Sequence, residues 1–313
     1  MPQFKHVIWG GTRIGAFKGI DLGCHTHVGE SWELSGLAGH ESVVAMGDEA
    51  GIKLPELIAI HGTDLVGERL WREHGTRFPL LFKLLDATLD LSVQVHPDKA
   101  MARSVHGGTG KSEMWYVIAA EPGTRIAAGL HREYTRDELA NLVAEHRIMD
   151  AVEMYDVAQG DVYDLPAGTI HMLGAGCLAL EVQQASDITY RLWDYDRIDS
   201  DGNRRELHTE LALQAIDCTS VKCKQEVSAL PGEVVRLVKR PEYDVMLVDV
   251  DGTTRHELDS DTCHVLMCVA GEVTLTAADG VTERVKRGDT LLMPSGYDAL
   301  VLQGKARLIS VKP

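Results

Sequence analysis

Short apolar runs separated by turn residues recur along most of the chain, and this pattern predicts a mainly β protein. The strand-like runs are rich in Val, Leu, Ile and aromatic residues and cover residues 91–98, 113–120, 178–185, 188–195, 242–252, 264–277 and 306–313. Glycine, at 30 of 313 residues, is plentiful enough to supply many tight turns between them. We therefore expect antiparallel sheets as the main architecture.

Helical spacing interrupts this pattern in a few places. Residues 41–51, 53–62 and 63–75 carry apolar positions three or four apart, which predicts helices in the first third. Residues 134–146 predict another helix, because Thr135 and Glu138 form a capping box ahead of an apolar stripe. A short helix is expected within 205–218, followed by a connection at 223–233. We place a domain boundary there, giving units of residues 1–225 and 226–313.

Two stretches of the chain repeat one corner pattern. "GDVYDLPAGTIH" runs from Gly160 to His171, and "GDTLLMPSGYDA" runs from Gly288 to Ala299. Both have Gly-Asp, a proline and a glycine at the same spacing, which predicts a tight turn that delivers the next strand at a set angle. The pattern indicates a duplicated β unit in which only the first copy keeps a histidine at the end.

This spacing resembles the second signature of the cupins, small jelly-roll β-barrels in which the final histidine is a metal ligand. The resemblance implies two cupin-type barrels, the first with a few inserted helices and a metal site. The second is expected to be degenerate and metal-free, with Ala299 in place of the histidine and His264 where the first copy has Glu113.

Partners for His171 come from two strand-like runs. Gln94 and His96 are two residues apart, so their side chains share one face of a strand, and Glu113 begins the next run. Two imidazoles, a carboxylate and an amide oxygen suit zinc or another divalent first-row metal with a position left for water or substrate. A second His-x-His pair, His25 and His27, has no carboxylate at matching spacing, and we do not assign it to a metal.

Charge and composition limit the partners. Lys and Arg number 31 against 47 Asp and Glu, a formal net charge of −16, which argues against nucleic acid or an anionic membrane surface as partner. The start of the chain lacks an apolar signal core, no run is long enough to span a membrane, and six scattered cysteines form no CxxC pair. We expect a cytoplasmic protein with reduced thiols, in which an anionic substrate needs a local positive site.

Longer motifs resemble the type I phosphomannose isomerases, in the short form found in many bacteria. The matching stretches occur in the family's order and are GESWELSG, FPLLFKLLDA, LSVQVHPD, KSEMWYVI, LPAGTIHMLGAG, EVQQASDITYR and DYDR. The resemblance covers nearly all of the first two thirds, whereas the last third is similar only as a second, metal-free cupin unit. It implies a zinc-dependent isomerase that interconverts mannose 6-phosphate and fructose 6-phosphate through an enediol.

The resemblance also implies the site residues. Gln94, His96, Glu113 and His171 would hold one zinc ion. The substrate pocket would draw on Trp32, Glu33, Ser92, Lys111, Glu181, Asp187 and Arg191. Lys111 and Glu113 face the same way on a strand, as do Ser92 and Gln94, so Lys111 and Ser92 are suited to hold the sugar phosphate near the metal.

The general base is left open at this stage. Glu181 is our first choice, although a salt bridge to Arg191 is an alternative role for it. Asp187 is a second candidate, but we favour an orienting role towards Arg191 four residues on, and metal-bound water is the third. Some longer relatives have a histidine directly before the lysine, where this chain has Gly110.

Two other functions stay open. A non-catalytic cupin that binds sugar phosphates would keep the fold and lose turnover. A cupin enzyme of another reaction class, such as an iron oxygenase, would also use two histidines and a carboxylate. The phosphate- and sugar-directed residues favour the isomerase over both.

Overall fold

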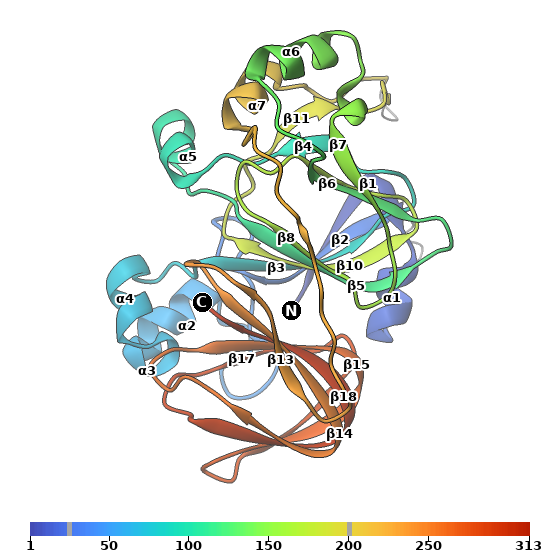
Figure 1. Cartoon of the computed structure of the whole chain (residues 1–313). Coiled ribbons are helices and arrows are strands. Elements are labelled where there is room, and N and C mark those ends of the chain that lie inside the picture. The colour runs from blue at the N-terminus through green and yellow to red at the C-terminus, as the bar shows by residue number, and fades with distance from the viewer. Residues whose placement is uncertain (24–26, 199–201) are drawn as a thin grey trace.

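A computed structural model describes residues 1–23, 27–198 and 202–313, and in it two β-rich units lie one above the other (Figure 1). The N-terminal unit contains a seven-stranded and a five-stranded antiparallel sheet. In sheet order the first is β1 (Gln3–Gly11), β2 (Val28–Ser35), β3 (Leu80–Asp86), β10 (Cys177–Gln184), β5 (Glu113–Ala120), β8 (Val162–Leu165) and β12 (Lys224–Gln225). The second is β11 (Tyr190–Trp193), β4 (Val93–Val95), β9 (His171–Leu173), β6 (Arg125–Leu130) and β7 (Val152–Asp156).

The C-terminal unit is built on three strands of 14 residues each, β14 (Asp244–Glu257), β15 (His264–Ala277) and β18 (Ala299–Lys312). They are flanked by β13 (Val234–Lys239) and β16 (Thr282–Lys286), while β17 (Thr290–Met293) pairs with β15. The mainly β prediction is thus confirmed. The expected boundary after residue 225 falls in the segment between β12 and β13.

Short helices occur in several of the segments that connect the strands. They are α1 (Arg13–Lys18), α2 (Leu54–His61), α3 (Thr63–Val66), α4 (Glu68–His74), α5 (Lys99–His106), α6 (Arg136–Ala144) and α7 (Thr209–Ala215), with a 3-10 turn η1 (Ile148–Asp150). The capping box at Thr135 and Glu138 is present at the start of α6, as predicted. Helices α1 and α5 were not predicted, although Asp98 caps α5 and Gly107 ends it in the left-handed conformation.

The helix expected over residues 41–51 is wrong. Gly47 and Gly51 have φ values of 86° and 95°, which turn the chain, and Val43 bridges Lys53 in an antiparallel manner. The helix expected over 63–75 is divided at Gly67, whose φ is 84°. A Cβ atom there would lie 2.1 Å from the carbonyl oxygen of Asp261 in the C-terminal unit. Contact between the units therefore requires glycine at this break.

The repeated corner has the same backbone in both units. Gly160 and Gly288 have φ values of 89° and 90°, and Gly168 and Gly296 have 90° and 91°. Each first glycine donates its N–H to a carbonyl of the strand opposite, at 2.8 Å in both copies. The structure thus confirms that the sequence repeat is a structural repeat.

The seven-stranded sheet has two differently used faces. Alternate residues of β3, β5 and β10, such as Phe82, Met114 and Leu180, pack into an apolar core shared with Val245 and Ile309 of the C-terminal unit. The residues between them face the interior of the N-terminal unit. One sheet therefore holds the two units together with one face and forms the candidate site with the other.

Polar contacts reinforce the junction between the units. Lys18 forms an ion pair with Glu33 at 2.6 Å and also donates to the carbonyl oxygen of Gly288 at 2.6 Å. Arg240 of the C-terminal unit pairs with Asp164 at 2.6 Å. Glu33 therefore belongs to this junction, although it is adjacent in sequence to Trp32.

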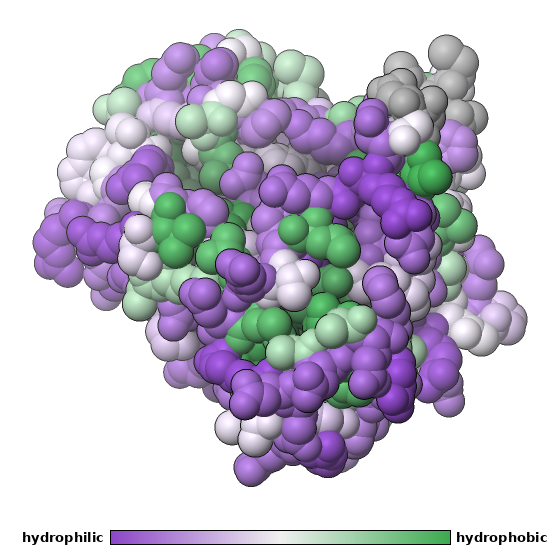
Figure 2. Space-filling model, turned by 90° about the horizontal axis from the view of Figure 1, so that it is seen from above, coloured by the Kyte–Doolittle hydropathy of each residue, from purple (hydrophilic) through white to green (hydrophobic). Residues whose placement is uncertain are grey.

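The outer surface contrasts with this apolar junction. The face that carries α6 and α7 is largely hydrophilic, with apolar groups in separate places (Figure 2). Among the described residues, none of the helices has the length and apolar character needed to cross a bilayer.

Deleting residues 233–313 should expose the apolar face of the seven-stranded sheet, because Phe82, Leu84 and Leu180 would lose the strands that cover them. We expect the truncated protein to aggregate, as measured by the soluble fraction and by size-exclusion chromatography. A truncated protein that stays folded, soluble and active would contradict this role.

A pair of point variants tests the same junction without deleting it. Leu247→Ala should lower the free energy of unfolding by about 2–5 kcal/mol, because Leu247 is buried in the shared core. The control is Val301, an exposed residue on β18. Val301→Ala should change the free energy of unfolding by roughly 0.5 kcal/mol or less. Denaturant unfolding of both variants measures the difference.

Candidate active site

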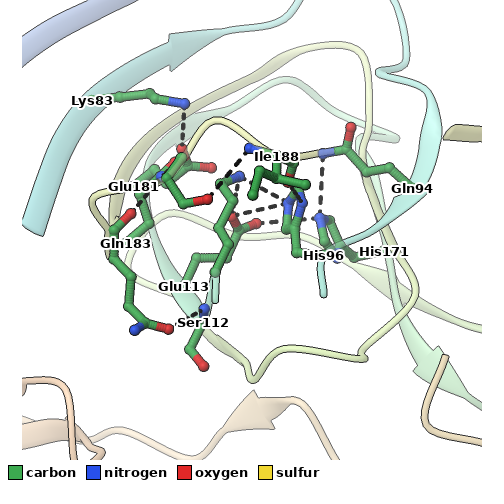
Figure 3. A network of polar contacts seen from close by, with 12 residues as sticks. Lys83, Gln94, His96, Ser112, Glu113, His171, Glu181, Gln183 and Ile188 are labelled. Carbon is green, nitrogen blue, oxygen red and sulfur yellow. Dashed lines mark hydrogen bonds and ion pairs between the residues drawn. The ribbon is translucent and has the colours of Figure 1, made fainter. Parts of the chain in front are cut away.

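Three buried side chains converge inside the N-terminal unit from three different strands or strand ends (Figure 3). Glu113 begins β5 and His171 begins β9, while His96 directly follows β4. The Nε2 atoms of His96 and His171 each lie 3.3 Å from a different carboxylate oxygen of Glu113. Among the described residues, these three form the group of His, Cys and carboxylate side chains whose ligand atoms lie close enough together, within 4.8 Å of one another, to hold a metal ion.

Backbone carbonyls set the orientation of both imidazole rings. His96 Nδ1 lies 2.9 Å from the carbonyl oxygen of Ile188, and His171 Nδ1 lies 2.8 Å from that of Thr169. A carbonyl can only accept, so Nδ1 carries the hydrogen in each ring and Nε2 keeps its lone pair. Both lone pairs are therefore directed at the position where a cation would bind, an arrangement typical of metal-binding histidines.

Lys111 is the positive charge nearest to the cluster. Its Nζ donates to Glu113 Oε2 at 2.7 Å and lies 2.8 Å from His96 Nε2. Burial opposes ionisation of Glu113, but the charge of Lys111 outweighs that penalty and holds the pKa of Glu113 well below its usual value. Burial, followed by the charge of Lys111, lowers the pKa of His96 to about 3, so this ring stays neutral.

These side chains fit a divalent cation. Glu113 Oε1 is buried and has no hydrogen-bond partner among the described residues. Gln94 completes the set, because its amide Nε2 lies 3.3 Å from His171 Nε2 and a half-turn of the amide would present the oxygen instead. Two neutral imidazoles, one carboxylate and one amide suit zinc or a similar first-row ion.

A row of polar and aromatic side chains crosses the seven-stranded sheet beside the cluster. The register pairs Trp32 with Lys83, Lys83 with Glu181, and Glu181 with Trp115, so all four point to the same face. Trp115 lies edge-on to the ring of His171, with centroids 5.4 Å apart. The row therefore extends the site away from the metal ligands.

Glu181 is the acidic group of this row. Its Oε2 accepts a hydrogen bond from Trp115 Nε1 at 3.0 Å, and its Oε1 lies 3.1 Å from Lys83 Nζ. Lys83 also lies 3.7 Å from Glu30. Burial disfavours the charge of Lys83, but the two carboxylates outweigh it and raise the pKa of Lys83. Glu181 therefore pairs with Lys83, and no ion pair between Glu181 and Arg191 is found among the described residues.

A second row crosses the five-stranded sheet. Arg191 on β11 is opposite Gln94 on β4, and Gln94 is opposite His171 on β9, so the three side chains share one face. Arg191 is half-buried, and its Nε has no partner among the described residues. Burial, together with the charge of Arg205, lowers the pKa of Arg191. A guanidinium with an unused donor thus lies beside the residues that could hold a metal ion.

Comparison with known proteins identifies the family. The model of the catalytic domain of type I phosphomannose isomerases matches residues 1–123. Mannose-6-phosphate isomerase ManA of Bacillus subtilis is 34% identical over 313 residues, covering 98% of this chain and 96% of the relative. The chain belongs to the type I phosphomannose isomerase family. Mannose-6-phosphate isomerase of Streptococcus mutans is also 34% identical, over 98% of this chain and 95% of that protein.

Solved structures agree with this assignment. The crystal structure of the Bacillus subtilis mannose 6-phosphate isomerase has a TM-score of 0.89, with 30% identity, and covers 100% of this chain and 98% of that one. A phosphomannose isomerase structure from Salmonella typhimurium has a TM-score of 0.81 at 16% identity, which shows a common fold. The family resemblance inferred from the sequence motifs is therefore confirmed.

The structure brings most of the sequence-predicted residues together. Ser92 donates to Gln94 Oε1 at 3.2 Å, and Trp32 stacks under Lys83, whose Nζ is 5.1 Å from the ring centre. Glu33, however, faces the junction between the units, and Asp187 is exposed. No ion pair in the described ranges joins Asp187 to Arg191, so its expected orienting role has no contact to support it.

Among the described residues, neither His27 nor any cysteine belongs to the group with metal-ligand spacing. His27 Nδ1 is 3.3 Å from the carbonyl oxygen of Gly10, away from the metal ligands, whereas His25 and Cys24 lie outside the described residues. The five other cysteines are free thiols. The packing around Gly110 explains why a glycine occupies this position, since a Cβ there would lie 2.7 Å from the backbone nitrogen of Lys99. A histidine at this position would require α5 to move.

Lys83, Glu30 and Trp115 are the site residues that sequence reasoning missed. Lys83 is a charge in the middle of the apolar strand LLFKLLD, which has only Asp86 at its end as a second one, and a lysine is almost never buried without a partner. A lysine within such an apolar run therefore indicates a buried ion pair, and this was the signal that could have identified Lys83. Its partner Glu30 lies on β2 and Glu181 lies on β10, so only the strand pairing reveals the ion pair.

His171→Ala should abolish stoichiometric metal binding, because it removes one of the two imidazole lone pairs directed at the cation position. We expect zinc affinity to fall by at least about 100-fold, more than loss of an outer-sphere partner usually costs. Equilibrium dialysis with elemental analysis measures this. The control is His146→Ala, which removes an exposed histidine, and equal zinc retention by both variants would exclude His171 as a ligand.

Proposed function

We propose that the protein is a zinc-dependent mannose-6-phosphate isomerase, which interconverts mannose 6-phosphate and fructose 6-phosphate through an enediol with one zinc ion per chain. The observation that carries this proposal is the buried His96–Glu113–His171 group with the Glu181–Lys83 ion pair on the same interior face. Family membership over nearly the whole chain supports the substrate.

Local charge fits a phosphorylated sugar. The cations and carboxylates named at the site are equal in number, three and three: Lys83, Lys111 and Arg191 against Glu30, Glu113 and Glu181. A divalent ion held by Gln94, His96, Glu113 and His171 would make this interior net positive. A chain with a formal net charge of −16 needs such a site to hold a dianionic phosphate.

The reaction opens the sugar ring and then moves a proton between C2 and C1. When bound, zinc would supply Lewis-acid stabilisation of the oxygens on these carbons. Lys111 and Arg191 add positive charge and donors where negative charge develops on the enediol oxygens. His96, Glu113 and Glu181 are all buried, so the substrate carbons would lie in a largely enclosed interior.

Glu181 is the proposed general base. Trp115 and Lys83 hold its two oxygens in place, so the carboxylate is fixed before the substrate arrives. It can accept the proton from C2 and return it to C1, and a base so placed contributes about 10²–10⁴-fold. Lys83 is a positioning residue in this scheme. Ser92 and Lys111, on either side of the ligands, are the proposed phosphate contacts.

Purified protein should convert mannose 6-phosphate to fructose 6-phosphate in a coupled assay. We expect chelation to remove the activity and added zinc to restore it, while His171→Ala stays inactive. Folded, zinc-loaded protein that binds the sugar phosphate without turning it over would instead support a non-catalytic binding protein. Activity that requires iron and consumes oxygen would support a cupin enzyme of another reaction class.

Lys83→Met tests the role of the Glu181–Lys83 pair. Without the ammonium group 3.1 Å from its Oε1, the Glu181 carboxylate is no longer held in place. In steady-state kinetics we expect kcat to fall by about 10²-fold or more while KM changes little, because the base is misplaced but the substrate contacts remain. Lys83→Arg should restore part of the rate.

The matched control is Lys53→Met, which removes an exposed lysine that pairs with Glu41 on the surface. It should leave kcat and KM unchanged. A Lys83→Met variant that keeps the parent kcat, or that loses rate only through a raised KM, would show that Lys83 does not position Glu181.

A further inference from the structure

The C-terminal unit has a polar cavity at the place that corresponds to the active site. Glu113 pairs with Leu165 directly before Pro166, and His264 pairs with Met293 directly before Pro294. In the same way, Gln94 is opposite His171, and Glu257 is opposite Ala299. The register therefore makes His264 the counterpart of Glu113, as the sequence repeat predicts, and Glu257 the counterpart of Gln94.

The cavity has about 280 Å³ of space, close to the lower end of the roughly 300–1,000 Å³ typical of ligand pockets. It opens at the end of the interior apolar core of this unit, on the side of the sheet that faces away from the N-terminal unit. Residues that line it and bear on the ligand are Asp244, His256, Asp259, His264, Ser310 and Lys312. A unit that served only to cover the N-terminal sheet would not need polar side chains at this position.

Both histidines are nine-tenths buried or more, with exposures of 3% for His256 and 6% for His264. His264 Nε2 accepts a hydrogen bond from the backbone N–H of Asp259 at 3.0 Å. Its Nδ1 therefore carries the hydrogen and is a donor, and it has no partner among the described residues. Burial lowers the pKa of each ring to about 4, so both are neutral at pH 7.

His256 lines the cavity from the C-terminal end of β14, the strand whose first residue, Asp244, also lines it. Its Nε2 lies 2.8 Å from Ser310 Oγ, and its Nδ1 likewise has no partner among the described residues. Ser310 is opposite Leu266, two residues beyond His264, just as Glu181 is opposite Trp115. A hydroxyl and a neutral imidazole thus replace the base of the first unit.

The charges at the cavity cancel. Lys312 pairs with Asp259 at 3.0 Å and Arg236 pairs with Asp244 at 2.9 Å, while Arg255 pairs with Glu257 at the rim. An anion would find every cation already compensated, and a cation would find every carboxylate compensated. The Nε2 lone pair of His264 is also engaged, which disfavours a metal ion.

We propose that this cavity is a second binding site, for a neutral polyhydroxylated molecule the size of a monosaccharide. Hydroxyl groups both donate and accept, so they match a lining that mixes carboxylates, cations and imidazoles. A hydroxyl oxygen of the ligand would accept from His264 Nδ1. The site is distinct from the one in the N-terminal unit and does not depend on the reaction proposed there.

Histidine ring ¹⁵N NMR on the zinc-loaded full-length protein tests the proposal directly, with D-mannose as the probe. We expect D-mannose to shift the ring signals of His256 and His264, and to do so equally in the His171→Ala variant. Ser310→Ala should weaken this binding at least fivefold while isomerase activity changes less than twofold. Thr274→Ala, which removes an exposed hydroxyl from the same unit, should leave binding unchanged.

Several results would overturn the proposal. One is the absence of any shift at His256 and His264 with D-mannose up to about 100 mM, far above the concentrations at which specific sites fill. Another is inorganic phosphate moving these signals at lower concentration than D-mannose, which would assign an anion site. A third is a second equivalent of zinc moving them, which would assign a metal site. Unfolding of Ser310→Ala would not affect the test on the parent protein.

Discussion

The buried carboxylate of Glu113 is the constraint on which the site depends. A fully buried anion is stable only when positive charge compensates it, and here Lys111 does so beside two imidazoles whose lone pairs are directed at the place where a metal ion would bind. Each imidazole is in turn fixed by a backbone carbonyl at the end of a neighbouring segment. The backbone carbonyls of Thr169 and Ile188 must therefore lie where they can accept from these rings. The repeated Pro–Gly corner fixes the position of the first of the two.

Local signals predicted the parts of the fold that are themselves local. The capping box at Thr135 starts α6, and the two-residue spacing of Gln94 and His96 places both at the cluster. The helix expected at 41–51 failed because apolar spacing was weighed without the glycines at 47 and 51, which adopt positive φ. Helix propensity is a weak prior wherever glycine provides a turn.

The pairing of charges could not be predicted in the same way. Lys83, Glu30 and Glu181 lie on three strands that are far apart in sequence, and their contacts exist only because β2, β3 and β10 are neighbours. Strand order is a property of the whole sheet, so a single sequence holds little information about it. The partner of Glu181 was therefore missed, although its importance was inferred from the surrounding motif. The exposure of Asp187 is equally a result of tertiary packing.

The two faces of the seven-stranded sheet limit how this protein can vary over evolution. Met114 and Leu180 face the shared core, while Trp115 and Glu181, one residue further along, face the site. Substitutions can adjust either face without disturbing the other. An insertion or deletion of one residue in β5 or β10 would exchange the faces and disrupt the site and the junction at once. We therefore expect lengths of these strands to be held fixed among relatives even where their residues differ.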